Sequence, residues 1–140
     1  MMHSVTVYGF GSAFATTDSA KKVANDVDLL IVHQNTGHAS CKLAIDCKRL
    51  LVENISHAHV TMLSEGEEAL LLFIKTANAT PIGTVRADLF HSDLELLCKD
   101  LALIVGSEKV RRNDALESIG EAQSSKRPDA GIYSLGSTPN

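Results

Sequence analysis

Two short polar motifs, separated by thirteen residues, carry the chemistry that this sequence suggests. Gly11 and Ser12 form the first motif; Asp26 and Asp28 form the second, in an otherwise apolar run that continues to Val32. A glycine lets backbone amides approach a phosphate because no Cβ is in the way, and a serine hydroxyl adds a donor. Mg²⁺ is commonly held by one or two carboxylates together with substrate phosphates. The two motifs therefore indicate a site for a nucleotide and a divalent metal ion.

The second motif has the alternation of a strand. Successive side chains of a strand point to opposite faces, so Asp26 and Asp28 share one face, about 7 Å apart along the strand. Val27, Leu29 and Ile31 share the other face and would anchor the strand in a core. A lone Asp-x-Asp is also typical of an exposed strand start with two solvated acids. The preceding Gly-Ser turn and the length of the apolar run favour the metal site.

The pattern apolar-Gly-Ser, a spacer and Asp-apolar-Asp-apolar resembles the nucleotidyltransferase superfamily typified by DNA polymerase beta and kanamycin nucleotidyltransferase. The likeness is to the minimal stand-alone members of that superfamily. Residues 58–68, Ala-His-Val-Thr-Met-Leu-Ser-Glu-Gly-Glu-Glu, resemble its second conserved strand and the acidic helix start that follows. Together these segments cover roughly the first 80 residues of the chain.

The resemblance implies an α/β fold, with a small mixed β-sheet flanked by helices, and Mg²⁺-dependent transfer of an NMP group from an NTP to a hydroxyl of a protein or small molecule. Asp26 and Asp28 would hold Mg²⁺, or Mn²⁺ in its place, against the triphosphate. Gly11 and Ser12 would anchor the phosphates. Stand-alone members of the superfamily often work with a helical partner protein, so we expect such a partner or a second copy of this chain.

In this superfamily the second conserved strand carries a third carboxylate, and the matching residue here is His59. On a strand over 56–63, His57 and His59 share one face, which would look into the site if the strand lies beside Asp28. His59 is thus a third catalytic candidate, with His57 as its companion, or the two are an edge-strand pair exposed to water. Because histidine does not supply an anionic oxygen, the alternative function is a catalytically degenerate subunit that binds nucleotide or a partner.

Two adjacent lysines, Lys21 and Lys22, lie in the polar spacer between the motifs. The first half of this spacer could form a helical turn whose amides face a phosphate. The lysines are then candidate phosphate neighbours. Adjacent lysines in a polar segment also commonly serve only to solvate it.

Hydrophobic periodicity gives the elements that must position these residues. Period-two patterns and turn residues predict strands over 4–8, 26–33 and 56–63, and helical spacing of apolar residues predicts helices over 38–54, 64–78 and 92–106. Ser64 with Glu67, and Ser92 with Glu95, are capping-box patterns at two of the helix starts. Pro81 is expected to stop the second helix. The passage from strand to helix to strand over 26–63 favours two parallel neighbouring strands.

Length and composition limit the organisation of the chain. Its 140 residues, 44% of them hydrophobic, fit one compact domain, expected over residues 1–106. Residues 107–140 are polar, with few large apolar side chains, and are expected to form a mobile tail. The formal net charge of −4 gives no overall basic surface, so a long nucleic acid is not an expected partner.

The cysteines and the apolar runs indicate the cellular compartment of the protein. Cys41, Cys47 and Cys98 are an odd number, lie within apolar periodic segments and lack metal-ligand spacing, so we expect free, buried thiols rather than disulfides. No apolar run reaches membrane-spanning length, and the first eleven residues do not resemble a signal peptide. A cytoplasmic protein without a membrane partner is the expectation.

Overall fold

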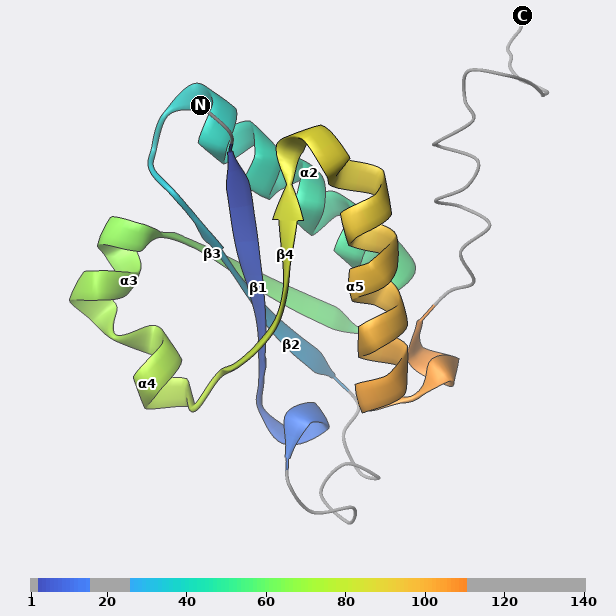
Figure 1. The fold of residues 1–140 in the computed structure, drawn as a ribbon. Helices are drawn as coiled ribbons and strands as arrows, with labels where there is room; N and C mark the ends of the chain where they lie inside the picture. The colour runs from blue at the N-terminus through green and yellow to red at the C-terminus, as the bar shows by residue number, and fades with distance from the viewer. Residues whose placement is uncertain (1–2, 16–25, 111–140) are drawn as a thin grey trace, which may run out of the picture.

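The computed structural model describes residues 3–15 and 26–110 (Figure 1). Its strands are β1 (Ser4–Phe10), β2 (Val27–His33), β3 (Ala58–Ser64) and β4 (Thr80–Arg86). Its α-helices are α2 (His38–Asn54), α3 (Glu65–Leu71), α4 (Phe73–Ala77) and α5 (Phe90–Val105). Three short 3₁₀ turns complete the elements: η1 (Ser12–Phe14), η2 (Ala87–Leu89) and η3 (Ser107–Lys109).

The four strands form one mixed sheet in the order β3-β2-β1-β4. β1 is antiparallel to both β2 and β4, whereas β2 and β3 are parallel. Helix α2 supplies the crossover between the parallel pair, since parallel strands cannot be joined by a tight turn. The expected α/β class with a small mixed sheet is confirmed, as is the parallel pairing of the second and third strands.

Helices α2 and α5 cover one face of this sheet. Side chains that alternate along β1 and β2, among them Val7, Leu29 and Ile31, are fully buried against the two helices. Helix α2 contributes Leu51 and α5 contributes Leu101 to the same cluster. We call this side of the sheet the helix-covered face. It holds the apolar core, and burial of these aliphatic side chains is the main favourable term in the stability of the domain.

The three cysteines are free, as expected. Cys47 of α2 and Cys98 of α5 are buried in the core, and Cys41 is partly exposed. Burial raises the pKa of the Cys47 thiol to about 12 and that of the Cys98 thiol to about 11. Both thiols therefore stay protonated at neutral pH and pack as small apolar groups.

The segment after β3 differs from the single helix expected over 64–78. It forms two short helices, α3 and α4, because Leu72 takes a left-handed backbone conformation, with φ of 53°, between them. The expected capping box is confirmed at the start: Ser64 Oγ accepts from the amide of Glu67, and the Glu67 carboxylate accepts from the amide of Ser64. The bonds from Ser64 also hold the pKa of Glu67 below its ordinary value.

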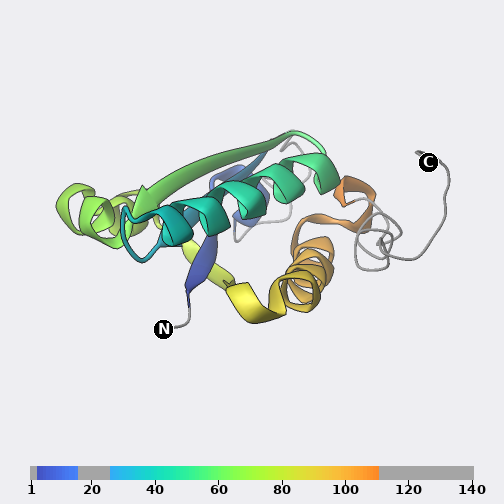
Figure 2. The same ribbon diagram turned by 90° about the horizontal axis from the view of Figure 1, so that it is seen from above.

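The apolar residues of α3 are exposed rather than buried. Leu70 is 86% exposed, and Leu71 and Leu72 are also exposed. Figures 1 and 2 show α3 and α4 at the opposite end of the molecule from α5. The apolar residues of this segment therefore do not join the core, because the link from β3 to β4 lies away from the helix-covered face.

Strand β4 was not predicted from the sequence, where Pro81 was interpreted only as a helix stop. The Pro81 ring is compatible with the strand because β4 is an edge strand and proline lacks a donor for the ladder. The pairing of β1 with β4 also shifts register between Val7 and Tyr8. This irregularity breaks the period-two pattern that would have identified the strand.

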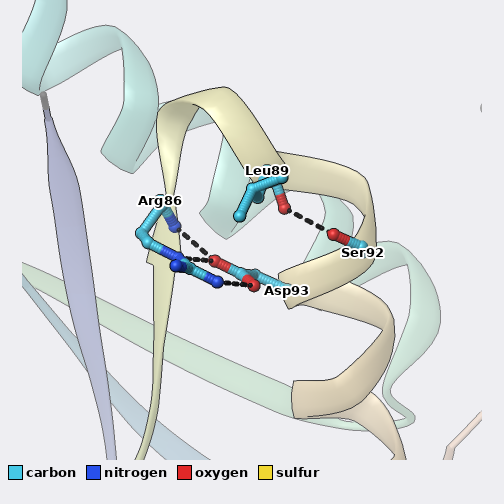
Figure 3. A network of polar contacts seen from close by, with 4 residues as sticks. All are labelled: Arg86, Leu89, Ser92 and Asp93. Atoms are coloured by element: carbon cyan, nitrogen blue, oxygen red, sulfur yellow. Dashed lines mark hydrogen bonds and ion pairs between the residues drawn. The ribbon is translucent and has the colours of Figure 1, made fainter.

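Helix α5 begins at Phe90, not at Ser92, and Leu89 rather than Ser92 is its N-cap. The Ser92 hydroxyl lies inside the first turn and donates to the carbonyl of Leu89 (Figure 3). The predicted capping box of Ser92 and Glu95 is therefore wrong. Asp93, in the first turns of α5, instead ties the helix to the end of β4, because its carboxylate accepts from the amide, Nε and Nη2 of Arg86 at 2.8–3.0 Å (Figure 3).

The C-terminal end of α5 agrees with the expectation, since Gly106 follows it with φ of 108°, a conformation that favours glycine. The described chain continues past residue 106 to Val110, which pairs with Ile55 after α2 and packs on the core. The rest of the expected tail, 111–140, lies outside the described residues. None of the helices in residues 3–15 and 26–110 is long and apolar enough to cross a membrane.

Candidate functional site

The candidate site residues meet where three strands share one edge of the sheet. β1 runs antiparallel to β2, so the end of β1 and the turn at Gly11 lie beside the start of β2, where Asp28 is found. β3 is parallel to β2 and starts at the same edge, with His59 in register with Asp28. The topology therefore brings both sequence motifs and the second conserved strand of the resemblance to one place.

These side chains lie on the face of the sheet opposite α2 and α5. Val7 and Leu29 point into the core, so their strand neighbours Tyr8, Phe10 and Asp28 point to the other side. His59 lies on that side as well, because Val60 packs against the core. We call this side, defined by Tyr8, Phe10, Asp28 and His59, the site face.

The Asp28 carboxylate lies directly beside Gly11, although the two residues belong to different sequence motifs. Gly11 has φ of 82°, which a residue with a Cβ rarely adopts. A Cβ at this position would also lie 2.6 Å from Asp28 Oδ2, closer than non-bonded atoms can approach. The turn therefore requires glycine for two independent reasons. The first is the backbone conformation, and the second is that the Asp28 carboxylate occupies the space that a Cβ of residue 11 would take.

Asp26 precedes β2 by one residue and is exposed, whereas Asp28 within the strand is partly buried. Asp26 Oδ1 lies 3.4 Å from Nε2 of His59, an ion pair when the imidazole is protonated. The two side chains are 57% and 64% exposed, so this contact is a weak solvent-screened one. It nonetheless brings together Asp26, the expected metal ligand, and His59, the third expected site residue.

Ser12 opens η1, a turn of only three residues, in the region where a helical turn was expected. Its side chain is exposed, and no hydrogen bond joins its hydroxyl to another residue that the structure describes. Phe14, which closes the turn, packs its ring over Gly9. The turn thus holds Gly11 and Ser12 at the end of β1 with the Ser12 hydroxyl facing solvent.

His57 does not share the strand face predicted for it. It lies in the turn before β3, with φ of 58°, and its carbonyl accepts from the amide of Val27. The prediction failed because β3 begins at Ala58, two residues later than expected. His57 is exposed and is not a companion of His59 on the site face. Of the two interpretations of the histidine pair, His59 fits both, since it is exposed on an edge strand and also contacts Asp26.

Lys21 and Lys22, the predicted phosphate neighbours, lie outside the described residues. Within the described residues, no group of three or more His, Cys, Asp or Glu side chains is placed to hold a metal ion by itself. The acids at hand are the pair Asp26 and Asp28. Two carboxylates suit Mg²⁺ bound jointly with phosphate oxygens and water, which is its usual mode at phosphate sites.

Two aromatic residues beside the acids were not singled out from the sequence. Phe10 is the cross-strand partner of Asp28, and Phe73 of α4 contacts Phe10 edge to face, with ring centroids 5.1 Å apart. The alternation of Tyr8 and Phe10 just before Gly11 could have placed Phe10 on the site face. Nothing in the sequence could have placed Phe73 there, because that contact depends on how α4 returns across the sheet.

Comparison of the chain with protein-family models, with curated proteins and with solved structures found no match.

Proposed function

We propose that the chain is a Mg²⁺-dependent nucleotidyltransferase, which moves an NMP group from an NTP to a hydroxyl acceptor. The observation that carries the proposal is the contact between Gly11 and the Asp28 carboxylate, with Asp26 and His59 beside it. A glycine turn next to paired acids at the edge of a sheet is an arrangement suited to phosphates and a divalent cation. The resemblance of the two motifs to nucleotidyltransferases supports the same conclusion.

Asp26 and Asp28 are the residues that would hold the metal ion. Bound there with the triphosphate, Mg²⁺ (or Mn²⁺) would neutralise phosphate charge as it develops in the reaction. The partly buried Asp28 is fixed by its strand, whereas Asp26 is exposed and free to turn toward a ligand. This difference suits a site in which one carboxylate is pre-organised and the other closes on the substrate.

The remaining residues would position the substrate. The amide of Gly11 and the hydroxyl of Ser12, both exposed residues, would anchor phosphates distal to the reacting one, which favours in-line attack at the α-phosphorus. In the reaction the acceptor oxygen bonds to that phosphorus, the bond to the bridging oxygen breaks, and pyrophosphate leaves. The acceptor hydroxyl also loses its proton, and neutral His59 is the nearby side chain able to take it.

The alternative function is a degenerate relative that binds nucleotide or a partner as a regulatory subunit. His59 in place of a third carboxylate favours this alternative, because its contact with Asp26 occupies an oxygen that a metal ion would need. The exposed leucines of α3, which include Leu70 and Leu71, are suited to contact a helical partner or a second copy of the chain. Both functions share the nucleotide site, and they differ in whether transfer occurs.

The first test is calorimetric binding of ATP, GTP, CTP and UTP with Mg²⁺ or Mn²⁺, which requires no knowledge of the acceptor. We expect metal-dependent binding, with an affinity that is at least about tenfold lower in Asp28→Asn. A loss of that size is typical even when the replaced residue only hydrogen-bonds to a metal ligand. Asp100→Asn, an exposed acid on α5, is the matched control and should bind as the unaltered chain does. Equal affinities of Asp28→Asn and Asp100→Asn would contradict the proposal.

His59→Asp separates the two functions once nucleotide binding is established. Labelled NTP is incubated with a set of hydroxyl acceptors and with the unaltered chain or the variant. Transfer by the unaltered chain that falls in the variant would assign His59 a working role in an active enzyme. Transfer by the variant alone would favour the degenerate subunit, because a restored carboxylate would then have completed the site.

A further inference from the structure

Aromatic side chains are gathered on the site face, although the chain has only four Phe, two Tyr and no Trp. Tyr8 and Phe10 alternate along β1 and point to this face, and Phe73 reaches it from α4. All three side chains are partly exposed, and neither Phe10 nor Phe73 belongs to the apolar core or packs against it. Phe10 and Phe73 therefore lie outside the apolar core, although Leu30, the register partner of Tyr8, is fully buried on the same face.

The position of Phe73 follows from the topology. The link from β3 to β4 joins strands at opposite edges of the sheet, so it has to pass β2 and β1. The contact between Phe73 and Phe10 shows that α4 meets the sheet on the site face. The left-handed backbone at Leu72 ends α3 and sets the direction in which α4, and Phe73 as its first residue, begins.

Phe10, Asp28 and His59 form one row across three strands. Phe10 is the register partner of Asp28 in β2, and Asp28 is the register partner of His59 in β3. Side chains that face each other on neighbouring strands have Cβ atoms about 5 Å apart. A planar apolar surface therefore stands on one side of the acid, a histidine stands on the other, and Gly11 follows Phe10 at the end of the row.

The geometry of the aromatic pair leaves ring surface available. The planes of Phe10 and Phe73 are inclined at 81°, so the edge of one ring meets a face of the other. Such a contact holds the rings in place, and both side chains remain partly exposed. A nucleotide has a planar base at one end and phosphates at the other, which matches an aromatic surface next to a phosphate and metal site.

We propose that Phe10, held by Phe73, stacks on the base of the nucleotide whose phosphates lie at Gly11 and Asp28. The inference rests on the proposed nucleotide site and adds the part that recognises the base. Stacking uses the π-face that every base has, so the site accepts all four bases. Purines stack over a larger area than pyrimidines, and ATP and GTP therefore bind more tightly than CTP and UTP.

The direct test uses Phe10→Trp, which places a single tryptophan in a chain that has none. Tryptophan keeps an aromatic face at this position, and its fluorescence responds when a base stacks on it. We expect quenching on titration with ATP and Mg²⁺, and none with inorganic tripolyphosphate and Mg²⁺ that occupies the phosphate site alone. Equal fluorescence changes with the two ligands, or none with either while both bind by calorimetry, would overturn the base site.

The complementary test removes the aromatic surface while retaining an apolar side chain. In Phe10→Leu, affinity for ATP should fall by about fivefold or more, since stacking on an aromatic side chain is worth at least about 1 kcal/mol per base. Phe73→Leu, which removes the ring that holds Phe10, should lower the affinity for ATP as well. Affinity for tripolyphosphate should not change. Phe90→Leu is the matched control, because Phe90 also makes an edge-to-face contact, with His91 at 5.3 Å, but packs on the core side.

The outcomes separate this inference from the proposed function. If the unaltered chain does not bind tripolyphosphate, or if Asp28→Asn binds it equally well, the nucleotide site and the base site are both overturned. Normal tripolyphosphate binding with an unchanged ATP affinity in Phe10→Leu would overturn the base site alone. A similar loss of ATP and tripolyphosphate affinity in Phe10→Leu would also overturn it, since the ring would then only support the fold around Asp28.

Discussion

The two faces of the sheet are built from the same strands and differ most near the candidate site, whereas farther along β2 the site face also carries the fully buried Leu30. On the helix-covered face, Val7, Leu29 and Ile31 are fully buried aliphatic residues. On the site face, their immediate neighbours include Phe10 and Asp28, which are partly exposed. No ion pair between described residues lies within the aliphatic cluster, whereas Asp26 and His59 pair on the site side.

Near the candidate site, stability and candidate chemistry are therefore divided between alternate residues of single strands. Leu29 and Asp28 are adjacent in sequence, yet one is held by the helices and the other stands at the glycine turn. Because side chains of a strand alternate, changes at neighbouring positions should have separate consequences. The predictions below test that separation, from the largest expected effect on stability to the smallest.

Leu29→Ala is expected to have the largest effect. Leu29 is fully buried in the core, and replacement by alanine leaves a cavity, so the free energy of unfolding should fall by about 2–5 kcal/mol. Asp28→Asn, one residue away, should change it by less than about 1 kcal/mol. Urea denaturation followed by circular dichroism measures both. Comparable losses in the two variants would show that the faces do not divide stability from the site.

Asp93→Asn tests the polar contact at the border of the helix-covered face, where α5 begins. Asp93 is buried and accepts three hydrogen bonds from Arg86, so its neutral isostere should cost about 1–3 kcal/mol at pH 7. The hydrogen bond from the Arg86 side chain, with the neighbouring positive charge, holds the pKa of the Asp93 carboxyl below its ordinary value.

The sign of the pH dependence follows from that direction. A carboxyl with a lowered folded-state pKa contributes stability above its unfolded pKa, about 4, and loses it as the pH falls through the folded value. The stability difference between the unaltered chain and Asp93→Asn should therefore shrink below about pH 4. Urea midpoints at a series of pH values measure it, and a difference that persists to pH 2 would contradict the assignment.

Gly11→Ala should have a smaller effect on stability than Leu29→Ala and a large one on the site. The backbone of Gly11, with φ of 82° and ψ of −168°, lies in a region that is essentially restricted to glycine, so alanine should cost about 1–3 kcal/mol, and the new Cβ must displace the Asp28 carboxylate. The metal-dependent affinity for ATP should therefore fall in Gly11→Ala, because Asp28 no longer lies in its place. Gly66→Ala in α3 is the matched control, since a Cβ there meets nothing closer than 3.9 Å and the helix favours alanine. Equal ATP affinities in the two variants would refute a role for the Gly11 turn.

Local patterns in the sequence were sufficient where an element has one regular face toward the core. The spacing of Leu43, Cys47 and Leu50 predicted α2 with the bounds that the structure has, and the apolar run after Asp26 predicted β2 to within one residue. Regular patterns failed where the chain is irregular. The shifted register opposite β4 and the left-handed Leu72 each interrupt a period, so the strand and the break between α3 and α4 were missed.

Local sequence patterns alone specify the strands and helices that have one apolar side, and they place the acids and the glycine at strand ends. These follow from side-chain alternation and backbone sterics, which act between near neighbours in the chain. Only the tertiary structure decided that Gly11 touches Asp28, that His59 rather than His57 joins Asp26, and that Phe73 meets Phe10. Those contacts depend on strand order and register, which are fixed when distant segments pack together over a common core.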